Sequence, residues 1–298
     1  MDVRLTSAGR ILFPEDGITK GDLFAYYERI APVLVPHLRD RPFTLKRYPH
    51  GIEGKVYFQK QIPRGAPSWL RTRRFTTHPR GGGSREVDFA LVDSPDALLW
   101  MVQMNCVDMN AWYSRVDRPD RPDFVVFDLD PPDGPYGYAL AIEVAHLIRG
   151  LLDELELPGH VKTSGADGIH VLAPIQRRAD YDDTYAFAEA VSRLLERRHP
   201  GKVTTEWLKR KRDGVLVDHR QNGWGKTIAS VYSVRPKPGA PVSTPLGWEE
   251  LTAEVRPRDF TMTGVLQRVA LHGDLFAPVL EEPRPLAAAA RRLRRLVE

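Results

Sequence analysis

Apolar side chains recur every three to four residues in several parts of the chain, which is the spacing of an amphipathic helix. Thr19 with Asp22 forms a capping-box pattern, and Ser94 followed by Pro95 is a second helix start. We therefore predict helices between Thr19 and Pro42, from Pro95 to Met104, and over residues 138–155, 182–198, 263–272 and 286–297.

Short runs rich in aromatic and β-branched residues lie between these helices and predict strands. The runs occupy residues 43–48, 56–60, 69–76, 87–92, 124–130, 160–165, 169–175, 203–207, 214–219 and 227–234. Asp167-Gly168 separates two of them and is a hairpin signal, whereas residues 79–86 and 236–247, rich in glycine or proline, predict loops. Strands mixed with helices and hairpins indicate an α+β fold with mixed or antiparallel sheets rather than a purely parallel one.

The chain has 298 residues, enough for one large domain or for two closely packed modules. Its composition shifts at RVDRPDRPD, residues 115–123, which is the best candidate for a junction. We expect a single domain over residues 1–298, with an N-terminal module at about 1–115, a second module at about 120–275 and a basic helical tail at 280–298. The tail residues expected to pack against the body are Leu286, Ala289, Leu293 and Leu296.

Charge is spread unevenly along the chain. Lys and Arg number 43 against 39 Asp and Glu, and the net charge of +4 favours an anionic partner. Basic residues gather in 64–85, 209–212 and 291–295, which together favour nucleic acid, although any one cluster alone can be a solvated surface. The single cysteine, Cys106, excludes an internal disulfide and a cysteine-rich zinc site. Without a signal-peptide pattern or a membrane-length apolar run, a cytoplasmic protein is expected.

Two carboxylates close the apolar run FVVFDLD. Asp128 and Asp130 are two residues apart on a predicted strand, so their side chains point to the same face. Like charges this close repel, and a divalent cation with oxygen ligands is the natural remedy. Two alternatives remain open: a pair of exposed acids in the turn before Pro131, and the Asp-x-Asp pattern of nucleotide-sugar transferases.

A third carboxylate, Asp218, ends the apolar run VLVD. An unpaired carboxylate in such a strand is costly, so it either pairs with a neighbour such as Arg220 or joins the other two acids. Three carboxylates on adjacent strands can hold two metal ions about 3.5–4 Å apart, the arrangement used for nucleotidyl transfer.

The segment TSGADGIHV, residues 163–171, combines small residues with a histidine. Ser164, Gly165 and Gly168 predict a tight turn whose backbone N–H groups are free to meet an anion. His170 either contacts a phosphate or is a structural histidine in a hairpin, and both interpretations stay open.

The chain resembles the polymerase domain of bacterial ligase D in blocks that occur in order: LFPEDGITKGDLFAYY, DLDPP, SGADGIH and VLVDHRQNGWGKTIASVYSVRPKPGAPVSTPLGW. That domain belongs to the archaeo-eukaryotic primase superfamily. The resemblance covers about residues 3–275 and implies a primase-like fold of two intimate modules, with DNA-contacting loops in the first and the catalytic core in the second. No ligase or nuclease segment accompanies it, so the chain is similar to the stand-alone primase-polymerases of this family.

The resemblance implies a role for each matching residue. Asp128, Asp130 and Asp218 would be catalytic and would bind two divalent metal ions, Mn²⁺ in preference to Mg²⁺. The implied nucleotide-binding residues are Lys46, Tyr57, Phe58, Ser164, Gly165, His170, Lys211, Gln221 and Arg235. The residues that would hold a 5′-phosphate of the downstream DNA strand are Ser7, Arg10 and Lys20.

Some positions depart from the family pattern. Asn110 stands in place of an active-site histidine, and Asp167 in place of a lysine in the turn. Ser7 stands where asparagine is usual, and Arg10 where lysine is usual. The first two changes bear on catalysis, because an amide cannot supply a proton and an acid repels a triphosphate.

These residues and the resemblance lead to one hypothesis. The chain is expected to be a metal-dependent primase-polymerase that adds nucleotides, ribonucleotides in preference, to primer 3′-OH groups at short gaps or double-strand-break ends in DNA repair. Expected partners are gapped or broken DNA, nucleoside triphosphates, a separate ATP-dependent DNA ligase and an end-binding protein, at the bacterial nucleoid. The alternative is a catalytically weak module that bridges DNA ends.

Overall fold

The structure, a computed structural model, describes residues 3–77 and 82–298. The chain divides into two compact units. Unit 1 comprises Met1–Asp117, Thr227–Pro241 and Thr261–Gly273, and unit 2 comprises Arg118–Lys226, Val242–Phe260 and Asp274–Glu298.

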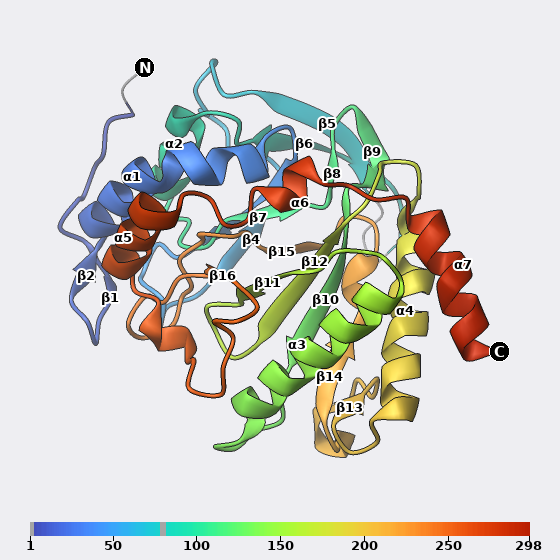
Figure 1. Ribbon diagram of the computed structural model, residues 1–298. Helices are drawn as coiled ribbons and strands as arrows, with labels where there is room; N and C mark the ends of the chain where they lie inside the picture. The colour runs from blue at the N-terminus through green and yellow to red at the C-terminus, as the bar shows by residue number, and fades with distance from the viewer. Residues whose placement is uncertain (1–2, 78–81) are drawn as a thin grey trace. The chain divides into compact units, whose positions relative to one another are not determined.

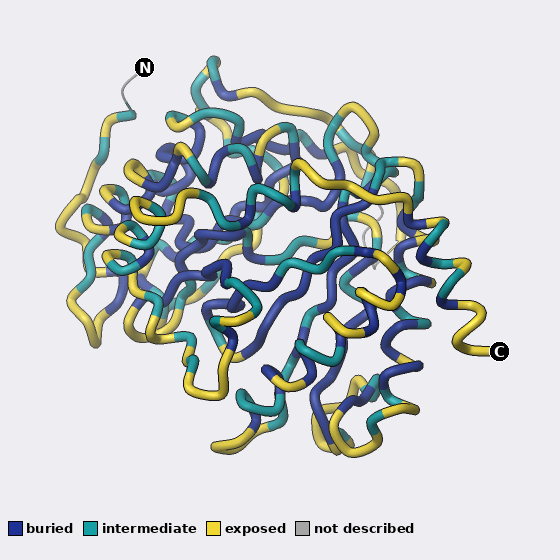
Figure 2. Tube along the Cα trace, in the orientation of Figure 1, coloured by how far each residue is buried: buried dark blue, intermediate teal, exposed yellow. Residues whose placement is uncertain are grey.

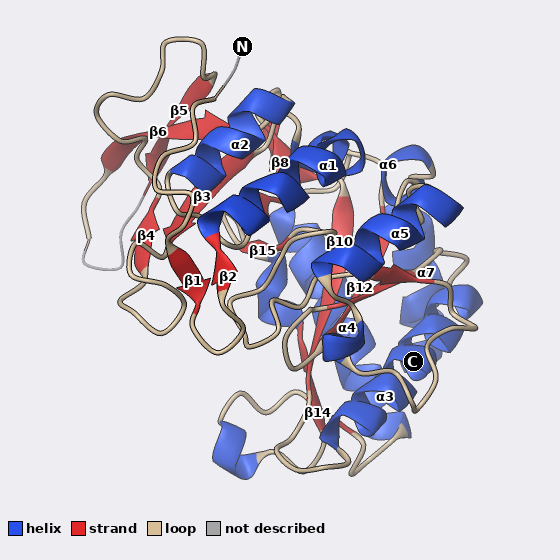
Figure 3. Ribbon diagram, turned by 90° about the vertical axis from the view of Figure 1, so that its left-hand side faces the viewer, coloured by secondary structure: helices blue, strands red, loops and turns tan. Residues whose placement is uncertain are grey.

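Unit 1 is built on an antiparallel sheet. Its elements are β1 (Ile11–Phe13), β2 (Ile18–Thr19), α1 (Lys20–Leu38), β3 (Pro42–Arg47), β4 (Tyr57–Gln59), β5 (Thr72–Thr77), β6 (Arg85–Leu91), α2 (Pro95–Gln103), β7 (Asn110–Trp112), β8 (Ser114–Arg115), β15 (Thr227–Ala229) and α5 (Met262–His272). The strand order is β15-β7-β3-β6-β5, and β4 pairs with β3. Helix α1 packs against both α2 and α5 (Figures 1 and 3).

Helices α1 and α2 of unit 1 begin where their capping residues predict. The Thr19 side chain accepts a hydrogen bond from Asp22 N–H at 3.1 Å, and the Asp22 carboxylate accepts one from Thr19 N–H at 2.9 Å. Ser94 Oγ accepts from Ala97 N–H at 3.1 Å at the start of α2. Local sequence therefore sets both helix starts.

Unit 2 contains a six-stranded sheet. Its elements are β9 (Arg118–Pro122), β10 (Phe124–Asp130), α3 (Gly137–Glu154), β11 (His160–Thr163), β12 (Ile169–Pro174), α4 (Tyr181–Arg198), β13 (Val203–Thr204), η1 (Lys209–Lys211), β14 (Val215–Asp218), η2 (His219–Asn222), β16 (Pro245–Leu246), η3 (Pro257–Asp259), α6 (Pro278–Glu281) and α7 (Leu286–Val297). The strand order is β13-β14-β10-β12-β11-β16, in which β13 and β14 are parallel and the other neighbours are antiparallel.

The two faces of strand β10 carry different residues. Val125, Phe127 and Leu129 are fully buried in the core that α3 and α4 share with the sheet. Asp128 and Asp130 alternate with them and so occupy the other face. Figure 2 shows the central strands of this sheet mostly as buried chain. The alternation therefore turns both acids away from the helices α3 and α4.

The α+β class with antiparallel and mixed sheets is confirmed, but the extents of several elements are corrected. The strand predicted at 203–207 ends at Thr204, and the one predicted at 227–234 ends at Ala229. The loop predicted at 79–86 is partly wrong, because residues 85–86 belong to β6, while residues 79–81 lie outside the described residues. Propensity alone therefore misplaces the ends of these strands, since pairing with neighbouring strands decides where they stop.

Two further expectations change. Residues 227–241 and 261–273 lie in unit 1, not in the second module, because β15 pairs with β7. In the tail, Leu286, Ala289 and Leu293 are buried as expected, but Leu296 is 39% exposed, since it lies in the last turn of α7. Among the described residues, the helices are all too short or too polar to cross a membrane.

Candidate active site

Four polar side chains form a row across the central strands of unit 2. The antiparallel register sets Asp128 of β10 opposite Asp218 of β14 on one side and opposite His170 of β12 on the other. His170 is in turn opposite Lys162 of β11. Directly opposed residues of antiparallel strands share a face, so these side chains point the same way. Asp130 joins them two residues along β10.

Hydrogen bonds connect the side chains of this row to one another and to the backbone. His170 Nε2 lies 3.2 Å from Asp128 Oδ1, and His170 Nδ1 lies 2.7 Å from Lys162 Nζ. Both ring nitrogens therefore have protein partners, which is the structural-histidine interpretation. Asp218 Oδ1 accepts the backbone N–H of Arg220 at 3.0 Å, so the contact with Arg220 is a main-chain hydrogen bond.

Burial and repulsion act on the carboxylates of the row. Burial, and then the charge of Asp128, raise the pKa of Asp130 to about 6, and the charge of Arg212 opposes the rise. The pKa of Asp218 is also raised, again by burial first and by Asp128 second. Burial and mutual repulsion therefore both make the ionised form of Asp130 and Asp218 costly.

The donor chemistry of Asp128, Asp130 and Asp218 fits a hard divalent cation, which binds carboxylate oxygens and offsets their repulsion. In the arrangement of residues 3–77 and 82–298, however, no three His, Cys, Asp or Glu side chains converge on a metal position. Two of the carboxylates are turned toward His170 and the Arg220 N–H group. The backbone thus places the three acids on adjacent strands, while their side chains face protein partners.

The turn after β11 corrects the prediction of free N–H groups. Ser164 Oγ accepts hydrogen bonds from Ala166 N–H at 3.1 Å and Gly168 N–H at 3.0 Å, and Ser164 N–H donates to Gly168 O at 2.9 Å. The prediction is wrong for these three N–H groups, because the serine closes the turn on itself. Gly165 supplies the positive φ of 68° that this turn needs, and Asp167 is exposed.

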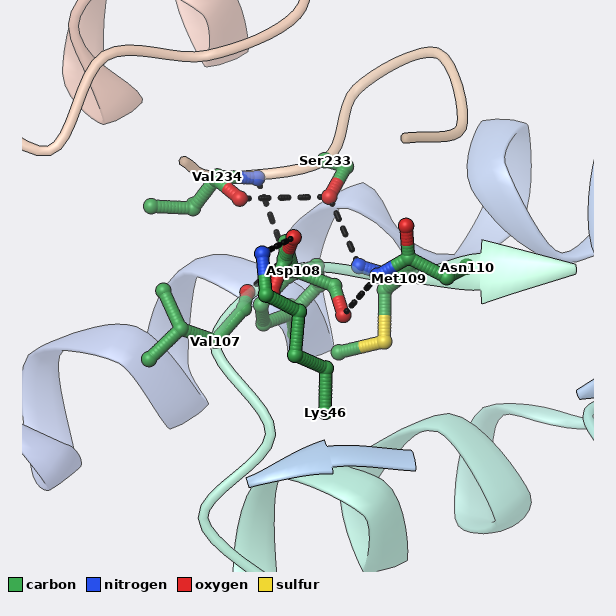
Figure 4. A network of polar contacts seen from close by, with 8 residues as sticks. Lys46, Val107, Asp108, Met109, Asn110, Ser233 and Val234 are labelled. Carbon is green, nitrogen blue, oxygen red and sulfur yellow. Dashed lines mark hydrogen bonds and ion pairs between the residues drawn. The ribbon is translucent and has the colours of Figure 1, made fainter. Parts of the chain in front are cut away.

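In unit 1, a buried carboxylate holds the predicted nucleotide-binding lysine (Figure 4). Lys46 Nζ of β3 lies 3.0 Å from Asp108 Oδ2, and the Asp108 side chain is only 1% exposed. The same ammonium lies 5.6 Å from the ring centroid of Tyr48 and 5.7 Å from that of Phe58, within cation–π range. Lys46 is therefore fixed by one acid and two aromatic rings.

The predicted stacking residues lie on β4 of unit 1. Phe58 is 72% exposed and Tyr57 is 44% exposed, and an exposed aromatic ring beside a cation is a stacking surface for a base. Arg235 is half-buried in the same unit. Its charge opposes the rise that burial causes in the pKa of Tyr48, so Arg235 lies within electrostatic reach of that phenol.

Asn110, which departs from the family histidine, begins strand β7. Its side-chain amide donates to the Asp108 carbonyl at 3.1 Å (Figure 4). The next residue back, Met109, donates its N–H to Ser233 Oγ at 2.8 Å. The second bond ties the start of β7 to the segment just before Arg235.

The three predicted 5′-phosphate residues lie together at the start of α1. Lys20 N–H donates to Arg10 O at 2.8 Å, and Arg10 N–H donates to Ser7 O at 3.0 Å. The Lys20 ammonium is buried and donates to Gln103 O at 2.8 Å, and burial followed by the Arg10 charge lowers the pKa of Lys20 to about 8. Ser7 and Arg10 are exposed, with Arg10 Nη1 donating to Pro49 O at 3.0 Å.

Two other predicted nucleotide contacts lie on the 3-10 helices that flank β14. Lys211 is exposed at the end of η1, and Gln221 is half-buried in η2. The residue bonded to the active-site strand is Asn222, whose Oδ1 accepts from Val126 N–H and whose Nδ2 donates to Val126 O, both at 2.8 Å.

Lys162, Asp108 and Asn222 take part in these contacts but were not predicted from the sequence. Strand alternation could have found Lys162, because it is the one lysine in HVKT, next to a turn that carries chemistry. A charge in the apolar stretch CVDM likewise marks Asp108. No local pattern distinguishes Asn222 from its polar neighbours.

Replacing Asp130 by asparagine is expected to stabilise the metal-free protein at pH 8 but not near pH 4. Because its folded-state pKa is raised to about 6, the proton of Asp130 adds stability below the unfolded pKa of 3.8, and this is lost as pH rises through 6. The asparagine avoids that loss, worth about 1–2 kcal/mol after solvent screening. Urea unfolding in EDTA at both pH values measures the change in the free energy of unfolding, and Asp133→Asn at an exposed position is the control. An equal change at pH 4 and pH 8 would contradict the prediction.

Comparisons with known proteins all point to one family. The family model for the LigD primase-polymerase domain matches residues 19–276. The chain is 34% identical over 288 residues to the multifunctional non-homologous end joining protein LigD of Mycolicibacterium smegmatis, covering 96% of this chain and 37% of that protein. It is 33% identical over 274 residues to the protein of the same name from Pseudomonas aeruginosa, covering 91% and 32%. The chain thus spans less than two fifths of the length of these relatives.

A solved structure gives the same result for the fold. The polymerase domain from Mycobacterium tuberculosis ligase D, solved in complex with DNA, superposes with a TM-score of 0.86 at 32% identity, covering 95% of this chain and 99% of that one. These matches favour a polymerase over a nucleotide-sugar transferase. The chain belongs to the family of LigD primase-polymerase domains and is, with that family, a nucleotidyltransferase.

Proposed function

We propose that the chain is a metal-dependent primase-polymerase that adds nucleotides, preferably ribonucleotides, to a primer 3′-OH at short gaps or double-strand-break ends. The observation that carries this proposal is the register that sets Asp218, Asp128 and His170 in one row with Asp130 beside them. An acidic row in a nucleotidyltransferase family is a site for phosphoryl chemistry.

The three carboxylates are proposed to hold two divalent metal ions, with Mn²⁺ preferred to Mg²⁺. Such ions lower the pKa of an attacking hydroxyl and stabilise a leaving pyrophosphate. For this, Asp128 and Asp218 would exchange their present hydrogen bonds for the metal. The raised pKa values of Asp130 and Asp218 support the proposal, because a cation would relieve the repulsion that contributes to them.

The protein's other residues are proposed to bind the nucleotide. Lys46 and Arg235 would neutralise phosphate charge, and Tyr57 and Phe58 would stack on a base. The remaining proposed contacts are Ser164, Gly165, His170, Lys211 and Gln221. The exposure of Phe58 beside the Lys46 ammonium supports the stacking role.

Gapped or broken DNA is the proposed substrate, and the fact that the mycobacterial polymerase domain was solved in complex with DNA supports this choice. Ser7, Arg10 and Lys20 would grip the 5′-phosphate of the downstream strand. The proposal includes a cytoplasmic, nucleoid-associated location, and it includes an end-binding protein and an ATP-dependent DNA ligase as partners, since the relatives named above are end joining proteins.

Gap filling tests this function. On a short-gapped duplex, a downstream 5′-phosphate is expected to speed nucleotide addition over a 5′-hydroxyl, and Arg10→Gln is expected to remove most of that advantage, roughly tenfold for one charge-assisted contact. Arg29→Gln, an exposed change on α1 of the same unit, is the control. Addition that ignores the phosphate in the unmodified protein would discard the phosphate site but keep the polymerase.

A catalytically weak end-bridging module is the second candidate, and Asn110 and Asp167 favour it. Calorimetry with Mn²⁺, with and without a nucleoside triphosphate, separates the two. Metal uptake that strengthens with nucleotide supports the polymerase, whereas DNA binding without metal uptake supports the bridge.

Salt dependence tests the basic clusters. Replacing Arg210 and Lys211, both exposed on η1, by alanine is expected to make the slope of log K against log salt shallower, by about 0.9 for each phosphate that the protein no longer neutralises. Arg193→Ala is the control, because Arg193 is already paired with Glu189 at 2.8 Å. An unchanged slope would mean that this cluster is a solvated surface.

A further inference from the structure

Lys162 is a buried lysine to which the proposed function gives no role. It lies on β11, is 1% exposed, and stands opposite His170 in the row described above. Burying an ammonium is costly unless hydrogen bonds replace its water, so its partners show what it does.

The partners of Lys162 form a directed chain of hydrogen bonds. Ser243 Oγ donates its only proton to Thr163 O at 2.7 Å. The same oxygen must then accept from Lys162 Nζ, which lies 2.7 Å away. Lys162 is therefore the donor at that end, and its Nζ also lies 2.7 Å from His170 Nδ1.

This direction decides which ring nitrogen of His170 carries the proton. When Lys162 carries its usual positive charge it has no lone pair to offer, so Nδ1 accepts, and a neutral imidazole then has its hydrogen on Nε2. On the far side of the ring, Nε2 lies 3.2 Å from Asp128 Oδ1, and an ionised carboxylate only accepts. Both sides of the ring thus require the same tautomer.

We propose that Lys162 is a positioning residue that holds His170 in the Nε2–H tautomer, with that N–H aimed at the catalytic row. A flip of the ring would break the bonds to Lys162 and Asp128 together. The fixed N–H is a donor for an anionic oxygen: the Asp128 carboxylate in the free protein and, if the proposed function holds, a phosphate oxygen of the nucleotide.

Nitrogen NMR of the full chain tests the proposal without substrate. With ring-¹⁵N histidine, the His170 signals are those missing from the His170→Gln spectrum. At pH 8 we expect a protonated-type shift for Nε2 and an unprotonated-type shift for Nδ1. The reverse pattern in the unmodified protein would overturn the proposal, and this measurement needs no Lys162 variant to fold.

The Lys162→Met variant tests whether Lys162, and not Asp128 alone, fixes the tautomer of His170. It is expected to give a mixture of His170 tautomers and to raise the KM for nucleotide about 10–100-fold, as for other residues that orient a site from behind. Lys202→Met, an exposed lysine paired with Glu143 in the same unit, is the control. A pure Nε2–H tautomer with unchanged KM in Lys162→Met would refute the role of Lys162. This inference draws on the proposed function only for the phosphate contact. Because the tautomer is measured without nucleotide, a protein that adds no nucleotides would contradict the proposed polymerase function but not the assignment of the His170 tautomer.

Discussion

Replacing Asp128 and Asp130 together by alanine is expected to reduce nucleotide addition by about a thousandfold or more, to the level of the assay background. Both side chains leave the same face of β10, next to Asp218, and no other acid is aligned in that register in the described chain. Removing two of three carboxylates takes away the proposed metal ligands and the acceptor for His170. Primer extension with Mn²⁺ and with Mg²⁺ measures the loss.

A control must show that the lost activity comes from the altered site and not from unfolding of the protein. Removing two carboxylates that repel each other should leave the metal-free protein at least as stable, so its thermal midpoint should not fall. Asp133→Asn is the matched control, because Asp133 is an exposed acid three residues farther along and pairs with Lys209 at 2.6 Å. Full activity in the double variant would show that the chemistry lies elsewhere.

Gly168→Ala is expected to destabilise unit 2 by about 3 kcal/mol, which lowers the thermal midpoint by about 10 °C. A Cβ at Gly168 would sit well inside van der Waals distance of the Leu129 carbonyl oxygen, between the two acids of β10. The neighbour is backbone, so it cannot swing aside as a side chain would. The turn that carries Ser164 and the end of β10 must then separate.

Calorimetry and primer extension together check this second prediction. Gly150→Ala is the control: Gly150 is exposed on α3, a Cβ there meets nothing within 4 Å, and alanine in a helix should add roughly 0.5–1 kcal/mol. If Gly168→Ala is as stable and as active as the unmodified protein, the close packing of the turn against β10 is not required for stability or activity.

The sequence predicts those parts of the fold that local chemistry sets. The capping box at Thr19 and the Ser94-Pro95 pair predict the starts of α1 and α2, and the apolar spacing places α3 and α4 within a residue or two. The first helix was predicted to reach Pro42 but ends at Leu38, whereas FVVFDLD predicts β10 at its full extent. The short strands β13 and β15 were overextended, because their lengths depend on neighbours that contribute only two or three pairs.

The candidate site was predicted in part for the same reason. Asp128 and Asp130 are visible as a pair within one strand, since alternation is a local rule. That Asp218, His170 and Lys162 stand beside them depends on the register of strands far apart in the chain. The self-closed turn of Ser164 depends on side-chain geometry that the residue types alone do not give.

The interleaving of the two units has a consequence for how the chain folds during synthesis. Strand β7 is made early, but its neighbour β15 is made only after most of unit 2. Until then, the edge of β7 has no partner strand, and an unpaired edge is where nascent chains associate wrongly. Unit 1 therefore cannot complete its sheet first, although it contains the start of the chain. We therefore expect the sheet of unit 1 to be completed late and slowly, because the long chain segment between β7 and β15 must close before these strands can pair.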